Sequence, residues 1–127
     1  GSHPHTLQPI EYFLSDKNNI GEGIIAYSLG NFLSNQRWRY SDAGAVLNLT
    51  ITKNILTDKI KLKEASVIPT WVFKGVIKGK NEFVILPADT ASAYTYLKKS
   101  DRTDLIQSYL DSKDILKPVR GIISQDK

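Results

Sequence analysis

Residues 45–53, AVLNLTITK, alternate apolar and polar side chains more regularly than any other part of the chain. The apolar face would carry Leu47, Leu49 and Ile51, and the polar face Asn48, Thr50 and Thr52. A period of two residues is typical of a β-strand with one face buried and one face in water. This stretch therefore predicts a half-buried strand, from which the rest of the fold can be worked out.

The segments after this strand also have β character. Residues 58–68, DKIKLKEASVI, alternate with Ile60 and Leu62 on the inner face. The outer face carries Lys59, Lys61 and Lys63. A lysine row either protects a solvent-facing or edge strand from unwanted pairing or contacts an anion. Residues 70–87 continue as two β-type runs around a Gly-Lys-Asn turn. Together these segments predict a mostly antiparallel sheet.

The N-terminal third predicts a hairpin followed by a long loop. Residues 7–14 and 23–29 are short apolar-rich runs, and DKNNIGEG between them supplies turn residues. Residues 29–44 are polar and aromatic and contain two glycines, with neither helical nor strand periodicity. A loop of this length is often functional.

The C-terminal third predicts helices over residues 88–99 and 100–116. Ser100 is the expected N-cap of the second helix, with acidic residues in its first turn. Its apolar stripe would consist of Leu105, Ile106, Tyr109 and Leu110. Pro118 should end helical structure. The expected fold class is α+β, with a mostly antiparallel β-sheet and C-terminal helices.

Composition limits the functions that the chain can have. Its 127 residues, 41% hydrophobic and 24% charged, fit one globular domain. Because the chain lacks cysteine, any metal must take nitrogen and oxygen ligands. The net charge of +4 is concentrated in the middle of the chain, without the aromatic interleaving of a nucleic-acid binder. We therefore expect no nucleic-acid partner.

Two histidines flank a proline at the start, in GSHPHTLQPIEYF. In an extended chain, His3 and His5 project to the same side with Cα atoms about 6.6 Å apart. Pro4 restricts the backbone of this segment, so both imidazoles could converge on one metal or on a metal pair. The alternative is a chance pair, or a Gly-Ser-His remnant of a cleaved expression tag.

Two ordered blocks of sequence resemble the bacterial capsule synthesis family, the CapA or poly-gamma-glutamate biosynthesis proteins. Their pattern is GxHPHxxQPxE, then a strand, then YSLGNFxxxQ. The matching residues are Gly1, His3, Pro4, His5, Gln8, Pro9, Glu11, Tyr27, Ser28, Leu29, Gly30, Asn31, Phe32 and Gln36. The strong resemblance covers the first third of the chain, and a looser one extends to about residue 73.

This resemblance implies the C-terminal part of a calcineurin-like metallophosphoesterase fold, an α/β/β/α sandwich. His3 and His5 would be ligands of a two-metal centre of unknown divalent ions. Asn31 and Gln8 would lie beside it, where Asn31 could bind substrate or orient His5. Arg37 and Arg39 would bind a phosphate or polyanionic substrate, or else cover an apolar patch around Trp38. Alternatively, Asn31 is an ordinary turn residue and Gln8 an ordinary strand residue.

Proteins of the family carry their other ligands upstream of the His-Pro-His segment. Residues 1–127 are therefore expected to be one domain that is the C-terminal portion of a larger CapA-type domain, bound to its upstream part. Alone, the chain should be soluble, hold no metal and catalyse no hydrolysis; the full-length protein would be anchored extracytoplasmically at the cell envelope. Capsule polymer or proteins of the synthesis complex are the other expected partners, and exposed sheet surface predicts self-association. The alternative is a non-catalytic β-rich module that binds a polyanionic polymer or an assembly partner through its lysines.

Overall fold

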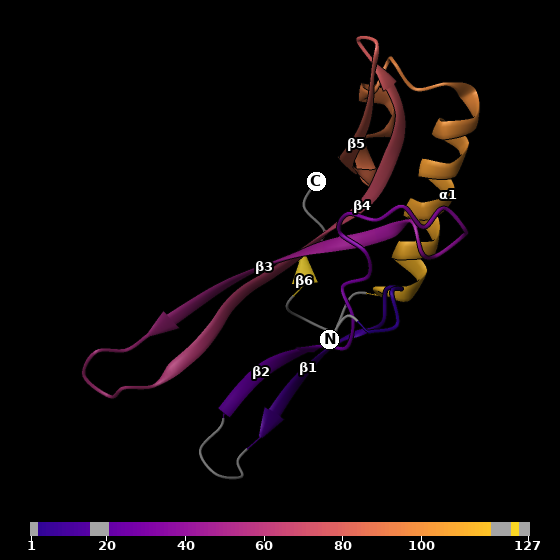
Figure 1. Ribbon diagram of the computed structural model, residues 1–127. Helices are drawn as coiled ribbons and strands as arrows, with labels where there is room; N and C mark the ends of the chain where they lie inside the picture. The colour runs from indigo at the N-terminus through magenta and orange to yellow at the C-terminus, as the bar shows by residue number, and fades with distance from the viewer. Residues whose placement is uncertain (1–2, 16–20, 118–122, 125–127) are drawn as a thin grey trace.

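The computed structural model describes residues 3–15, 21–117 and 123–124 and confirms a mostly antiparallel α+β fold (Figure 1). Its elements in chain order are β1 (Ile10–Ser15), β2 (Gly21–Ala26), β3 (Ala43–Lys53), β4 (Ile60–Ile77), β5 (Lys80–Pro87), the 3-10 helix η2 (Ala88–Ala93), α1 (Lys99–Ile115) and β6 (Ile123–Ser124).

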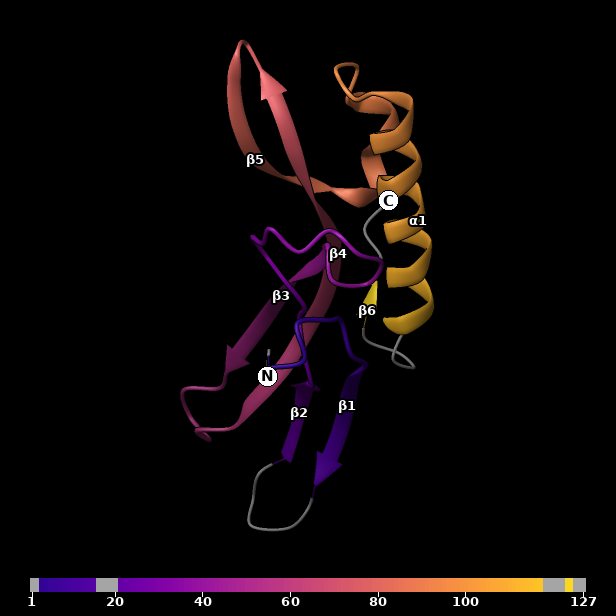
Figure 2. The same cartoon turned by 45° about the vertical axis from the view of Figure 1, so that its right-hand side comes forward.

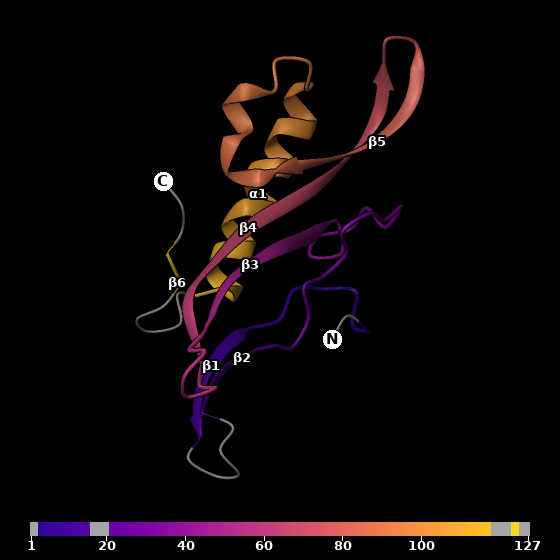
Figure 3. The ribbon, with the colours of Figure 1, turned by 90° about the vertical axis from the view of Figure 1, so that its left-hand side faces the viewer.

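The 18-residue strand β4 organises the larger sheet. Its first part pairs antiparallel with β3, and its second part, from Thr70, pairs with β5. Figure 3 shows β4 running through the molecule, with β3 beside one half and β5 beside the other. The strand predicted over 45–53 is confirmed as most of β3, and the turn after residue 77 is confirmed between β4 and β5. The predicted burial of the apolar faces is wrong toward the end of the β3–β4 hairpin, where Leu49, Ile51 and Ile60 are 44%, 61% and 63% exposed.

The predicted division between residues 58–68 and 70–77 is wrong, because β4 continues through Pro69. Pro69 lies opposite Ala45 in the β3–β4 pair. Ala45 donates its N–H to Leu29 O at 3.0 Å, away from β4. This pair therefore carries no hydrogen bond between the strands, and the N–H that proline lacks is not needed there.

The predicted N-terminal hairpin is confirmed by β1 and β2, which pair antiparallel from Ile10–Ala26 to Ser15–Gly21. Most of its predicted turn, residues 16–20, lies outside the described residues. The hairpin forms a sheet of its own. Isolated bridges join Leu7 to Leu29 and Gly30 to Gly44, so the segment before β1 is connected through the loop after β2 to the start of β3.

The helix predicted over residues 88–99 is wrong, because only the 3-10 segment η2 forms there and it is kinked at Thr90. Thr90 has non-helical angles (φ −110°, ψ 34°), and its hydroxyl donates to Pro87 O at 3.3 Å. The Arg102 guanidinium donates to the carbonyls of Ala91 and Tyr94 at 3.1 and 3.0 Å. These carbonyls are thereby satisfied from α1 rather than by a continuing helix.

The helix predicted over residues 100–116 is confirmed as α1, with two corrections. Its N-cap is Lys98 rather than Ser100, and no side chain caps the first turn. The predicted stripe is only partly buried, because Ile106 and Leu110 are 44% and 55% exposed. The buried helical positions are Leu105, Ser108 and Ser112. Serines are small enough for a close approach to the sheet, and the Ser112 hydroxyl donates to Ser108 O at 2.7 Å.

The buried side chains form two separate clusters rather than one core. One joins the base of the β1–β2 hairpin to the start of β3 and the end of α1, and comprises Leu7, Ile10, Ala43, Ala45, Val67 and Leu116. The other lies where β4, β5 and η2 meet α1, and comprises Trp71, Phe73, Leu86, Ala88, Leu97 and Leu105. Figure 2 shows α1 running along the sheet past both regions.

The molecule is extended, with the β3–β4 hairpin projecting as an arm from the body (Figure 1). Its accessible surface is 8781 Å². A compact monomer of 14.2 kDa is expected to expose about 6,800 Å². The excess surface comes with many exposed apolar side chains, among them Leu14, Phe32, Leu33, Trp38, Ile51, Ile55, Leu56 and Ile60.

Candidate functional site

His5 and Asn31 are 26 residues apart in sequence but are in contact in the structure. The Leu7–Leu29 bridge and the hydrogen bond from Gln8 N to Ser28 O (3.0 Å) align the segment before β1 with the loop after β2. His5 Nδ1 then lies 2.9 Å from Asn31 Oδ1. Pairing of the two sequence blocks therefore places the second histidine of the His-Pro-His segment against the asparagine of SLGNF.

The hydrogen bonds of Asn31 define which nitrogen of His5 carries the proton. Asn31 is 9% exposed, and its Nδ2 donates to Gln36 Oε1 at 2.9 Å and to Ser41 O at 2.7 Å. Both amide hydrogens are used, so Oδ1 accepts and His5 Nδ1 donates. A neutral His5 in this arrangement has its lone pair on Nε2, the atom that is left to bind a metal or accept a proton.

Two glycines allow the loop to close around Asn31. Gly30 has φ +67°, and a Cβ at this position would lie 2.5 Å from Ala43 O. A Cβ on Gly44 would lie 2.5 Å from Asn31 O. Asn31 N also donates to Ala43 O at 3.0 Å. The main chain on both sides of Asn31 is thus packed directly against the start of β3.

The backbone around His5 is not extended, which corrects the geometry predicted for the histidine pair. His3 and Pro4 form a turn, and His5 has a φ of +54°. A left-handed conformation is unusual for a residue with a Cβ and is found where surrounding contacts hold it. The estimate of 6.6 Å for two rings on one side of a strand therefore does not apply. His3 and His5 are both exposed.

The other predicted residues of the first block lie along the hairpin. Gln8 is half-buried, and its main chain joins the two blocks through Ser28. Glu11 on β1 accepts a hydrogen bond from the Tyr27 hydroxyl at 2.9 Å. This hydrogen bond to the carboxylate raises the pKa of Tyr27. Asn31 is therefore the predicted residue that the structure brings to His5 by a direct hydrogen bond.

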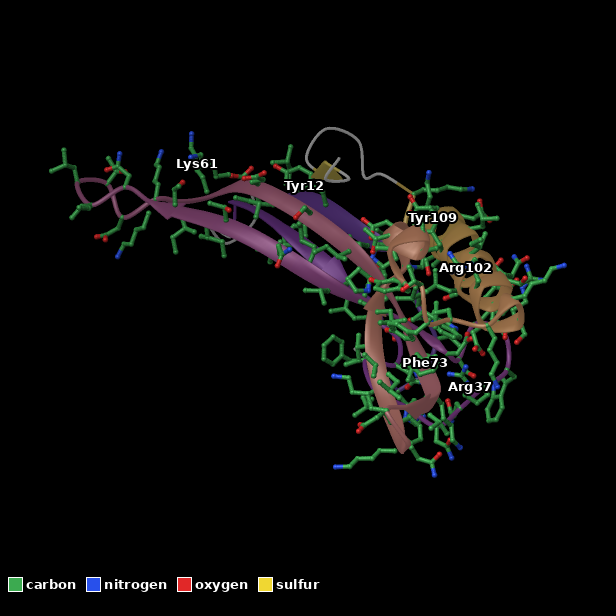
Figure 4. All side chains as sticks on the ribbon, turned by 90° about the horizontal axis from the view of Figure 1, so that it is seen from above. Tyr12, Arg37, Lys61, Phe73, Arg102 and Tyr109 are labelled. Atoms are coloured by element: carbon green, nitrogen blue, oxygen red, sulfur yellow. The ribbon has the colours of Figure 1, made fainter. Side chains whose placement is uncertain are left out.

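Arg37 and Arg39, the predicted substrate-binding residues, both have partners within the chain. The Arg37 guanidinium lies 4.9 Å from the centre of the Trp71 ring and donates to Val72 O. Arg39 donates through Nε and Nη2 to the two carboxylate oxygens of Asp111, both at 2.7 Å. Figure 4 shows Arg37 on the same side of the body as Phe73. The two arginines thus attach the loop to β4 and to α1.

The ion pair between Arg39 and Asp111 shifts both pKa values. The hydrogen bond from Arg39 lowers the pKa of Asp111, and the carboxylate raises the pKa of Arg39 further above its ordinary value. Gln107 also donates to Asp111 at 2.9 Å. Each shift favours the charged form, so the pair persists across the neutral pH range.

Asp42 is a buried carboxylate that the sequence analysis missed. It is 7% exposed and accepts a hydrogen bond from Trp71 Nε1 at 2.7 Å. Burial raises the pKa of Asp42, while the Trp71 N–H and the charge of Arg37 act in the opposite direction. Gln36 and Gly44 were also missed as site residues, although Gln36 belongs to the motif. The one sequence feature that could have pointed to Asp42 and Gly44 is their place in Ser-Asp-Ala-Gly, residues 41–44, directly before the strand predicted over 45–53.

Among residues 3–15, 21–117 and 123–124, no three His, Cys, Asp or Glu side chains cluster in a way that could hold a metal ion. A catalytic metal usually takes about three protein ligands. The described residues thus provide an oriented imidazole but no ligand set of three. In the part of the chain that the structure describes, no helix has the length and apolar character to cross a bilayer.

Comparisons with known proteins agree with the two sequence blocks. Residues 1–36 match the family described as bacterial capsule synthesis protein PGA_cap. The capsule biosynthesis protein CapA of Bacillus anthracis is 28% identical over 107 residues, which cover 83% of this chain and 24% of that protein. The chain thus spans about a quarter of the length of this curated relative. No solved structure matches the chain.

Proposed function

Because this chain is related to the CapA-like capsule synthesis proteins, we propose that it is part of a capsule or poly-gamma-glutamate biosynthesis protein with a metallophosphoesterase-like fold. In this proposal, His3 and His5 supply imidazoles to a two-metal centre, and Asn31 positions His5. The contact between His5 Nδ1 and Asn31 Oδ1 is the observation that carries the proposal.

The donor arrangement at His5 fits a metal ligand. Histidines that bind metals usually donate their other ring N–H to an oxygen acceptor, which fixes the tautomer and orients the ring. Asn31 Oδ1 supplies that acceptor at 2.9 Å, and the amide itself is held by Gln36 and Ser41. In this arrangement Nε2 of His5 is the nitrogen that would face the metal.

Two bound divalent metals would polarise a phosphoryl oxygen and provide a hydroxide nucleophile at neutral pH. The residues of this chain have supporting roles in that chemistry: His5 binds, and Asn31 keeps its proton on Nδ1. Gln8 holds the two blocks together through its main-chain hydrogen bond to Ser28. To bind substrate, Arg37 and Arg39 would have to break their hydrogen bonds to Val72 O on β4 and to Asp111 on α1. We therefore propose that these two arginines attach the loop after β2 to β4 and α1.

We also propose that a larger domain completes the metal site and covers part of the exposed surface. Two observations support this proposal. The accessible surface of 8781 Å² is larger than that of a compact monomer of this mass, and apolar residues near the site are exposed, Phe32 by 55% and Trp38 by 65%. The upstream part of the same domain is the proposed main partner; capsule polymer and proteins of the synthesis complex are further ones. The proposed location is the extracytoplasmic side of the cell envelope, with the complete protein anchored to the membrane.

The test is His5→Ala in the complete protein that contains this chain. We expect bound divalent metal, measured by inductively coupled plasma mass spectrometry, to fall by at least half. Hydrolysis of a phosphodiester such as bis-p-nitrophenyl phosphate should fall by about a hundredfold or more. Without the His5 imidazole as a ligand, the metal that would activate the nucleophilic water is bound less well.

Two further variants make this result interpretable. Asn31→Ala should lower metal affinity by about 10- to 100-fold while leaving His5 in place. Tyr27→Phe, which removes an exposed hydrogen bond to Glu11, is the matched control and should retain metal and turnover. Unchanged metal content and turnover in His5→Ala would contradict the proposed site.

A further inference from the structure

The end of the β3–β4 arm presents an apolar tip surrounded by positive charge. Ile55 and Leu56 at the turn are 91% and 96% exposed, the highest values among the exposed large hydrophobic residues of the described chain. Figure 1 shows this turn at the outer end of the arm, away from α1 and from the loop that carries Asn31. We call residues 51–63 the arm tip.

The turn holds these two side chains outward by its own hydrogen bonds. Asn54 Oδ1 accepts from the N–H groups of Leu56 and Thr57, at 2.9 and 3.0 Å, and Asn54 N donates to Lys59 O at 2.8 Å. Asp58 has a φ of +54°. The turn is therefore organised by polar contacts of its backbone with the Asn54 side chain, and the side chains of Ile55 and Leu56 take no part in these contacts.

One face of the arm continues the apolar surface of the tip. Ile51 pairs with Leu62, and Lys53 with Ile60, so these side chains lie on the same face of the two strands. Ile51 and Ile60 are 61% and 63% exposed. The apolar surface therefore extends from the turn along one side of the arm.

Lysines dominate the charge of the arm tip. Residues 51–63 contain four lysines and a single acidic residue, Asp58, which pairs with Lys53 at 2.7 Å. Lys59, Lys61 and Lys63 are exposed and form no ion pair within the described part of the chain. Figure 4 shows Lys61 on the arm, well away from Phe73, Arg102 and Tyr109.

We propose that the arm tip is a contact site for an anionic lipid surface, with Ile55 and Leu56 entering the interface and the lysines contacting lipid head groups. A lipid surface is complementary to both features, because apolar side chains gain by burial at its acyl boundary and lysines are attracted to its negative charge. A soluble polyanion would satisfy the lysines but would leave the apolar pair in water. This inference is independent of the proposed metal site.

The test measures binding of the 127-residue chain to vesicles of phosphatidylcholine, with and without 40% phosphatidylglycerol, by flotation. We expect binding to the anionic vesicles and at least tenfold weaker binding to the neutral ones. Ile55→Ser combined with Leu56→Ser should weaken binding to anionic vesicles by about 10- to 100-fold. Lys61→Gln combined with Lys63→Gln should weaken it by about fivefold per lysine.

The matched control is Val76→Ser, at the other hairpin end. Val76 is 66% exposed and lies near Lys74, Lys78 and Lys80, but that turn has no adjacent pair of exposed apolar residues. This variant should bind anionic vesicles as the unchanged chain does. Circular dichroism would establish that each variant keeps its secondary structure.

Site-specific labelling provides a second readout, since the chain has no cysteine. An environment-sensitive fluorophore on Thr57→Cys should shift to the blue when anionic vesicles are added, and one on Val76→Cys should not. Equal vesicle binding by the Ile55→Ser/Leu56→Ser variant, or no shift at position 57, would overturn the proposal. So would retention on immobilised polyglutamate without vesicle binding, which would identify a polymer site.

Discussion

Replacing Trp71 with alanine is expected to destabilise the chain by about 3–5 kcal/mol, close to the whole stability of a small domain. Trp71 is fully buried in the cluster between β4, β5 and α1, and its ring lies under the Arg37 guanidinium. The substitution removes this packing and also takes the indole N–H donor away from the buried Asp42 carboxylate. Urea denaturation followed by circular dichroism should show a large loss of stability or no folded state.

Trp71→Phe separates packing from the hydrogen bond to Asp42. It keeps most of the buried ring but removes the Nε1–H, so we expect a loss of about 1.5–3 kcal/mol at neutral pH. The N–H lowers the pKa of Asp42, so its removal raises that pKa beyond the increase that burial already causes. A protonated carboxyl is less costly to bury than a carboxylate. The difference in free energy of unfolding between the unchanged chain and Trp71→Phe should therefore become smaller as the pH falls through the pKa of Asp42.

The matched control for both variants is Trp38→Phe, since Trp38 is 65% exposed. Its effect should stay within about 0.5 kcal/mol. A Trp71→Ala variant as stable as Trp38→Phe would contradict the assignment of Trp71 to the core. A Trp71→Phe deficit that does not change with pH would contradict the role of Asp42.

Gly44→Ala is expected to have the second largest effect, because the new methyl group would meet backbone atoms. Its Cβ would lie 2.5 Å from Asn31 O and 2.9 Å from Asn31 C, atoms that cannot rotate away as a side chain can. We expect a loss of about 1–3 kcal/mol in stability from overpacking. At the metal site proposed for the complete protein, displacement of Asn31 should also lower metal affinity by about 10- to 100-fold.

Gly79→Ala is the control for this prediction. Gly79 has φ +79°, and a Cβ there would meet nothing within 4 Å. Alanine in this left-handed position should cost about 1–2 kcal/mol without moving Asn31 or changing metal affinity. Normal stability and metal affinity in Gly44→Ala would show that the main chain around Asn31 is not as tightly packed as described.

The positions of the strands could be predicted from side-chain alternation, but the burial of their apolar faces could not, because Leu49, Ile51 and Ile60 are 44%, 61% and 63% exposed. Residues 45–53 and the N-terminal hairpin were predicted in this way and are confirmed. The continuity of β4 through Pro69 could not be predicted in this way. It depends on Ala45, which directs its N–H to Leu29, a tertiary contact absent from the local sequence.

The C-terminal region shows what apolar periodicity alone could not predict: which face of α1 is buried, and that residues 88–99 are not one helix. The buried positions of α1 include Ser108 and Ser112, which a hydrophobic pattern ranks as exposed. The helix predicted over residues 88–99 fails where Arg102, from the next element, binds the carbonyls of Ala91 and Tyr94. Only tertiary structure reveals either cause.

The candidate site was predictable to the extent that its motif residues are neighbours in space. The pairing of the two blocks brings His5 Nδ1 within hydrogen-bonding distance of Asn31 Oδ1, and the roles of both residues stay predictions. The arrangement of the histidine pair was not predicted, because His5 adopts a left-handed backbone rather than an extended one. Asp42 matters because it is buried, and Gly44 because the backbone of Asn31 approaches it closely. No sequence motif reports either property.

The central claim is that Asn31 Oδ1 keeps the proton of neutral His5 on Nδ1 and leaves Nε2 unprotonated. Long-range ¹H–¹⁵N NMR of the imidazole nitrogens, recorded at about pH 8.5 where imidazoles are ordinarily neutral, tests this claim directly. We predict the Nδ1–H tautomer for His5, and a mixture dominated by Nε2–H after Asn31→Ala. An Nε2–H tautomer of His5 in the unchanged chain would contradict the account.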